Sequence, residues 1–85
     1  MNIELKDKSQ GPVYAQVRDQ IENQIRGGQV SSGEALPSPT LLASRLAVDR
    51  GEVLRAYFEL ERSGLVKKEA SKDFLGQQKT VYRAA

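Results

Sequence analysis

Residues 42–50 read Leu42-Ala43-Ser44-Arg45-Leu46-Ala47-Val48-Asp49-Arg50, and they lie where one short helical pattern ends and the next begins. Leu42, Ala43 and Leu46 have the spacing of one buried helix face. Asp49 follows at once, and aspartate is typical of a helix N-cap. Two short helices joined by about three residues form a helix-turn-helix, in which the second helix is held rigidly at the surface. The stretch therefore predicts a helix-turn-helix.

The helices on both sides of this turn have clear boundaries. Ser38 as N-cap and Pro39 in the first turn begin the shorter helix, which is expected to end near residues 47–48. The next helix is expected over about 50–63. Its buried stripe follows the i, i+3, i+4, i+7 spacing and comprises Val53, Ala56, Tyr57 and Leu60. Glu52, three residues after Asp49, makes the start of this helix resemble a capping box.

The N-terminal part predicts one more helix. Pro12 occupies a first-turn position, and Gly27-Gly28 supplies the stop. The apolar stripe between them repeats every four residues and comprises Val13, Val17, Ile21 and Ile25. Residues 1–11 form an N-terminal arm, and residues 12–85 form one domain.

The pattern changes after Gly64. Residues 65–69 are typical of a strand, residues 70–73 of a polar turn, and Phe74-Leu75 and residues 80–83 are expected to pair back. The predicted fold class is mainly α with a small β-hairpin (α+β). The architecture is a winged helix-turn-helix, with three helices plus the hairpin as the wing.

The composition of the chain excludes several classes of protein. A chain of 85 residues has room for one small domain. The absence of cysteine and histidine excludes a disulfide framework, a zinc finger and histidine-dependent acid–base chemistry. No constellation of residues indicates an enzyme, a metal site or a cofactor site. The N-terminus lacks the pattern of a signal peptide, so a cytoplasmic protein without a membrane segment is expected.

Charge is distributed unevenly along the chain. The formal net charge is +2, but residues 41–85 carry nine basic and six acidic side chains, a net of +3. Five basic residues follow Leu65, against only two acidic ones. A basic patch of this kind is typical of nucleic-acid contact.

The whole pattern resembles the winged-helix DNA-binding domain of GntR-type bacterial transcription regulators, and within them the YtrA-like subgroup. The resemblance covers about residues 1–75. The matching positions are Ile3-Glu4, Pro12-Val13-Tyr14, Gln16, Ile21, Ile25, Gly28, Val30, Gly33, Leu36-Pro37-Ser38, Leu42-Ala43, Leu46, Val48, Val53, Ala56-Tyr57, Glu59-Leu60-Glu61 and Gly64-Leu65-Val66.

This resemblance implies a regulator that binds double-stranded DNA as a homodimer on a palindromic operator. The third helix, about 50–63, would enter the major groove, and the basic wing, about 65–83, would follow the backbone or the minor groove. The residues expected to contact DNA are Ser38, Thr40, Arg45, Arg50, Arg55, Lys67, Lys68 and Lys72.

The sequence also departs from the family pattern where the family touches DNA. Thr40 stands near the position at which the family usually carries an arginine, and Asp49 and Glu52 place carboxylates at the start of the third helix. In the wing, Ser71 and Asp73 replace two glycines. The alternative is therefore a protein-interaction or dimerisation module with weakened DNA binding. Its contact surface would be Leu41, Leu54 and Phe58.

Overall fold

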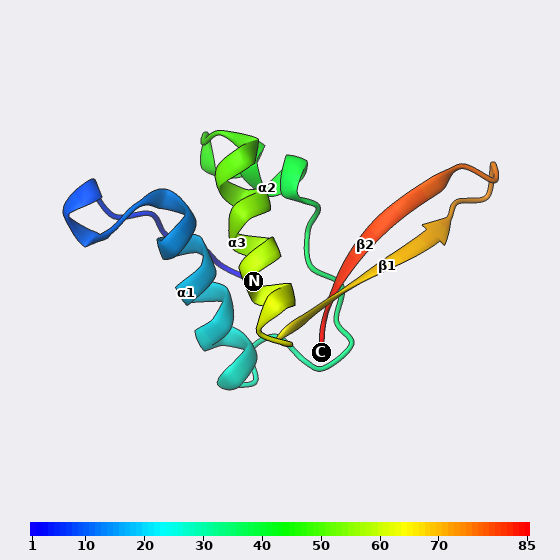
Figure 1. Cartoon of the computed structure of the whole chain (residues 1–85), viewed down its shortest axis with the longest axis horizontal. Coiled ribbons are helices and arrows are strands. Elements are labelled where there is room, and N and C mark those ends of the chain that lie inside the picture. The colour runs from blue at the N-terminus through cyan, green and yellow to red at the C-terminus, as the bar shows by residue number, and fades with distance from the viewer.

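The computed structural model describes all residues, 1–85, and contains the predicted three helices and hairpin (Figure 1). The elements are a short 3-10 helix η1 (Lys8–Gln10), α1 (Val13–Arg26), α2 (Pro39–Leu46), α3 (Arg50–Arg62), β1 (Val66–Lys72) and β2 (Gln78–Ala84). The helices pack together, and the hairpin runs from the end of α3 out to one side. No helix in the structure combines the length and the apolar character needed to cross a membrane.

The core lies between the helices and the base of the hairpin, and the predicted stripes form it. Val17 and Ile21 of α1 are fully buried, as are four residues of α3. The other members of this cluster come from the connector, α2 and the hairpin, and comprise Val30, Leu36, Leu42, Ala43, Val66, Tyr82 and Ala84. The helical periodicities predicted from the sequence are thereby confirmed.

The N-caps of α2 and α3 form as predicted, but the capping box does not. The Ser38 hydroxyl accepts from the Leu41 amide at 3.1 Å, and the Asp49 carboxylate accepts from the Gly51 amide at 3.3 Å. In a capping box Glu52 would reach back to the Asp49 amide. Instead its carboxylate accepts from the Tyr14 amide at 2.9 Å. This amide belongs to the first turn of α1, where amides have no acceptor inside their own helix.

The N-terminal arm lies along α1 and is held by three glutamines. The side chain of Gln20 bonds both backbone groups of Glu4, accepting at 2.8 Å and donating at 2.7 Å. Gln24 pairs with Asn2 in the same way, and Gln16 does so with Lys6 while also reaching Asp7 and Gly11. Two residues of extended chain rise about 6.6 Å and four residues of helix about 6.0 Å, so the two repeats match.

The hairpin differs from the prediction in the place of its turn. Its register runs from Val66↔Ala84 to Lys72↔Gln78, so β1 continues through residues 70–72 and the turn occupies residues 73–77. The expected pairing of Phe74-Leu75 was wrong, because Asp73 closes the turn before them. Its carboxylate accepts from the amides of Leu75 and Gln77, and Gly76 takes the positive φ of +80° that the turn needs.

The connector before α2 pairs with the free edge of β2. The Leu36 amide donates to the Tyr82 carbonyl at 2.8 Å, and Ala35 forms a bridge with Arg83. The buried Tyr57 hydroxyl donates to the Pro37 carbonyl at 2.7 Å. These bonds hold the start of α2 between α3 and the hairpin.

Candidate nucleic-acid interface

The starts of α2 and α3 meet the hairpin at a surface hollow of about 300 Å³. Its lining combines hydroxyl groups and cations from segments far apart in the sequence. The residues are Ser38, Pro39, Thr40, Arg50, Leu54, Lys68, Thr80 and Tyr82. Four residues expected to contact DNA, Ser38, Thr40, Arg50 and Lys68, are thus brought together.

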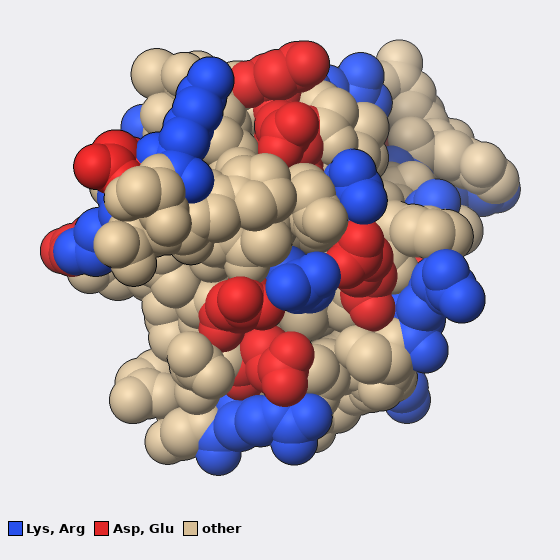
Figure 2. Space-filling model, turned by 60° about the vertical axis from the view of Figure 1, so that its left-hand side comes forward, with Lys and Arg blue, Asp and Glu red and all other residues tan.

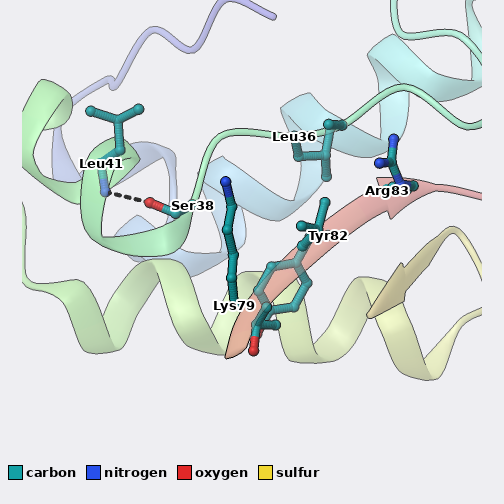
Figure 3. Close-up of a pocket in the computed structure, with 9 residues that line it drawn as sticks. Leu36, Ser38, Leu41, Lys79, Tyr82 and Arg83 are labelled. Carbon is teal, nitrogen blue, oxygen red and sulfur yellow. Dashed lines mark hydrogen bonds between the residues drawn. The ribbon is translucent and has the colours of Figure 1, made fainter. Parts of the chain in front are cut away.

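A second hollow, of about 440 Å³, lies beside the first, and Ser38, Thr80 and Tyr82 line both. In Figure 3 the side chain of Lys79 extends from β2 toward Ser38, which stands at the start of α2. Lys79 was not among the residues expected from the sequence to contact DNA. Its neighbours are set by the pairing of β2 with the connector and β1, which no local pattern reveals.

The alternation of side chains along β1 separates the predicted wing lysines. Lys68 lies opposite Tyr82, whose buried face points to the core, and Lys72 lies on the same face of the hairpin. Lys67 lies opposite Arg83 on the other face. There the Arg83 guanidinium is 3.7 Å from the Glu69 carboxylate. Lys68 and Lys72 therefore share the side of the first hollow, and Lys67 does not.

The start of α2 also offers a backbone donor to an anion. Amides in the first turn of a helix have no acceptor inside the helix. Pro39 has no amide hydrogen, and the Ser38 hydroxyl takes the Leu41 amide. The Thr40 amide remains, next to its own hydroxyl and to the hollow. The positive end of the helix dipole favours a phosphate oxygen at this place.

The structure places Arg55 away from these hollows. Its guanidinium carbon lies 3.7 Å from the centroid of the Tyr14 ring, on the side of α3 that meets α1, and its Nε is 3.4 Å from Glu59. Arg18 of α1 donates to the same Glu59 carboxylate at 2.6 Å. This bond to Arg18, with a smaller contribution from Arg55, lowers the pKa of Glu59. Arg45 is exposed on the last turn of α2 and lines neither hollow.

The three apolar residues of the alternative hypothesis lie among polar and charged groups. Leu41 lines the second hollow and Leu54 the first, together with hydroxyl groups and cations. Phe58 lies one helical turn after Leu54 on the same flank of α3, outside both hollows, and the Arg62 guanidinium is 5.8 Å from its ring centroid. The surface around them is therefore mixed in character, rather than one contiguous apolar area of the kind that protein interfaces present.

Charges are mixed on the opposite side of the molecule. Figure 2 turns forward the side that carries the arm and α1, and there basic and acidic groups alternate across the surface. Several of them form ion pairs, including Arg18 with Asp19 and Arg26 with Glu22, both at 2.9 Å. Such a face has no strong field of one sign to attract a polyanion. The hairpin, with five basic residues against Glu69 and Asp73, is the more positive part.

Comparisons with known proteins agree with this geometry. The family described as "Bacterial regulatory proteins, gntR family" matches residues 13–72. The HTH-type transcriptional repressor YtrA of Bacillus subtilis is 33% identical over 64 residues, which cover 75% of this chain and 49% of that protein. The HTH-type transcriptional regulator Rv1152 of Mycobacterium tuberculosis is 36% identical over 70 residues, covering 75% and 58%. The chain spans about half the length of these relatives.

Solved structures show the same architecture. YtrA from Sulfolobus acidocaldarius, a GntR-family transcription factor, superposes with a TM-score of 0.73 at 34% identity, covering 98% of this chain and 77% of that one. The DNA-binding domain of AraR, in complex with operator ORE1, superposes with a TM-score of 0.65 at 22% identity, covering 100% and 94%. The three helices and hairpin are thus a winged helix-turn-helix, as the sequence predicted.

Proposed function

The chain belongs to the GntR family of bacterial regulatory proteins, and we propose on this basis that it binds double-stranded DNA and regulates transcription. The members it matches are transcriptional regulators rather than enzymes. The observation that carries the proposal is the meeting of Ser38, Thr40, Arg50 and Lys68 at one hollow. The operator complex of AraR supports it, because that protein has the same fold.

The proposed binding mode follows from the positions of these groups. The first half of α3 enters the major groove, which is about 12 Å wide and admits one helix. Arg50 reads a base edge or a phosphate there, and the side chain of Leu54 lies one turn further along. Ser38 and the Thr40 amide hold a phosphate at the start of α2. Lys68 and Lys72 neutralise the backbone from one face of the hairpin, and Lys79, which the register places on the other face, does so from the edge of β2 beside Ser38.

Asp49 and Glu52, the two carboxylates that depart from the family pattern, are compatible with this mode of DNA binding. Glu52 turns to the Tyr14 amide at the start of α1, and Asp49 caps α3 by accepting from Gly51. Both charges are therefore partly satisfied inside the protein. Their repulsion of phosphate is weaker than two free carboxylates would exert.

Fluorescence anisotropy over a salt series tests the proposal. The expected log–log slope is about −0.9 for each phosphate neutralised, and a selected operator should bind more tightly than random duplex. Arg50→Ala should relax the sequence preference, whereas Arg62→Ala, at the far end of α3, is the matched control and should change little. Absence of binding even at low salt would overturn the proposal.

The two faces of the hairpin give a sharper comparison. Lys68→Ala and Lys67→Ala remove the same charge from neighbouring exposed positions. The proposal predicts that Lys68→Ala reduces the salt slope by about 1, while Lys67→Ala has a smaller effect. Equal losses would mean that long-range charge, and not contact at the hollow, drives binding.

We further infer that two copies bind one palindromic operator in the cytoplasm. A single α3 offers few side chains to base edges, and two half-sites about 34–36 Å apart would supply the missing specificity. Sedimentation of the protein on duplexes with one or two half-sites measures the stoichiometry. Two chains on the palindrome are expected. One chain per palindrome would contradict the dimer.

A further inference from the structure

The tip of the hairpin carries the two most exposed large apolar side chains of the protein. Phe74 is 95% exposed and Leu75 is 69% exposed. They lie in the turn at residues 73–77, at the end of the hairpin farthest from the helices (Figure 1). Neither residue contributes to the core. Adjacent exposed apolar groups on a small domain mark a binding surface.

The turn holds these side chains outward on a fixed backbone. The Asp73 carboxylate accepts from the Leu75 amide at 2.9 Å and from the Gln77 amide at 3.0 Å. The Asp73 carbonyl accepts from Gly76 at 2.9 Å, and its amide donates to Gln77 at 3.0 Å. The acidic group at the tip is thus engaged within the turn. A tip ordered in advance loses little conformational entropy when it binds.

The surroundings of the tip are cationic and continuous with the proposed DNA surface. Lys72 immediately precedes the turn, and Lys79 lies opposite Ser71, one position from the end of the ladder. Lys79 extends back toward Ser38 (Figure 3). Residues 79–83 of β2 line the second hollow, which therefore reaches to within a few residues of the turn at 73–77. In Figure 1 the starts of α2 and α3 and the tip all lie toward the top of the view.

We propose that Phe74 and Leu75 form an apolar wedge that enters the minor groove next to the major groove occupied by α3. This inference rests on the proposed function. Apolar side chains that enter the minor groove partly unstack a base step and kink the duplex, while nearby cations hold the phosphates. The wedge prefers a flexible pyrimidine–purine step, because such steps cost least to unstack. It therefore adds specificity at a position that α3 does not touch.

The experiment uses the full chain, a selected operator labelled at both ends for energy transfer, and 2-aminopurine at the step facing the tip. Wild type should shorten the end-to-end distance and raise the 2-aminopurine fluorescence. Phe74→Ala and Leu75→Ala should lose both signals and bind about tenfold more weakly. The salt slope should not change, since neither variant removes a charge. Phe58→Ala, an exposed phenylalanine 58% accessible on α3, is the matched control.

Each outcome decides the proposal. If Phe74→Ala bent the operator and raised the 2-aminopurine fluorescence as strongly as wild type, the wedge proposal would be wrong and the proposed function would stand. Failure of wild type to bind any duplex would overturn both. Binding of wild type, but not of Phe74→Ala, to vesicles of phosphatidylcholine and phosphatidylglycerol, without any change in the DNA signals, would assign the tip to a lipid surface and overturn the wedge. Circular dichroism confirms that the variants fold.

Discussion

The carboxylate of Glu52 accepts a hydrogen bond from the backbone amide of Tyr14 at 2.9 Å, across 38 positions of sequence. It thereby ties the start of α3 to the start of α1. Close by, the Tyr14 ring lies against the Arg55 guanidinium, and Glu59 pairs with both Arg18 and Arg55. These contacts fix α3 against its supporting helix on the flank opposite the proposed DNA surface.

Replacing Glu52 should destabilise the fold. Glu52→Ala removes the acceptor from an amide in the first turn of α1 and a negative charge from that helix end, so a loss of about 1 kcal/mol in the free energy of unfolding is expected. Urea denaturation measures it. Glu61→Ala, an exposed glutamate that forms no ion pair, is the control and should change stability little. A much tighter DNA complex with unchanged stability would show that Glu52 faces DNA instead.

Arg55 should contribute more to stability than to DNA binding. Arg55→Ala removes the cation above the Tyr14 ring and one partner of Glu59, which together are worth about 1 kcal/mol at an exposed site. Its effect on DNA affinity should be smaller than that of Arg50→Ala. A double-mutant cycle with Tyr14→Leu isolates the pair, and additive losses of unfolding free energy would contradict the coupling. If Arg55→Ala lost as much DNA affinity as Arg50→Ala, Arg55 would have to contact DNA after all.

The glutamine contacts should control the order of the N-terminal arm. Gln20→Ala removes both bonds to Glu4, so hydrogen exchange at the Glu4 amide should accelerate about tenfold, while the Lys6 amide, which donates to Gln16, and α3 remain protected. Ile3 and Leu5 still pack against the core and limit the effect. Asn23→Ala, at an exposed position of α1, is the matched control. Unchanged exchange at Glu4 would mean that apolar packing alone holds the arm.

Stability should fall in acid partly because of Glu59. Its pKa is lower in the folded protein than the ordinary 4.5, since the Arg18 bond favours the charged form. The unfolded chain therefore binds more protons, and the contribution is present above about pH 4.5 and lost as the pH falls through the folded value. Thermal unfolding of Glu59→Gln from about pH 7 to about pH 3 should show a shallower decline than wild type. Asp7, whose pKa is also lowered by its bonds to Ser9, remains in both proteins.

Local sequence patterns were sufficient to predict the three helices, their buried stripes, the N-caps at Ser38 and Asp49, and the winged architecture. Helical periodicity and capping act over a few residues, and these signals agreed with one another along the chain. The turn of the hairpin was also a local feature. Asp73 and Gly76 are typical of a turn, but the apolar pair Phe74-Leu75 between them is typical of a strand. The turn was therefore predicted at residues 70–73, too early in the chain.

The neighbours of the charged side chains depended on packing. The spacing in sequence predicted the Asp49 amide as the partner of the Glu52 carboxylate, but the packing of α1 against α3 brings it the Tyr14 amide instead. Likewise, Lys67 and Lys68 lie on opposite faces because side chains alternate along a strand, but only the register with Arg83 and Tyr82 decided which of them faces the hollow. Contacts between distant segments depend on the whole fold, so the sequence named candidate residues while packing and register selected those that meet at one surface.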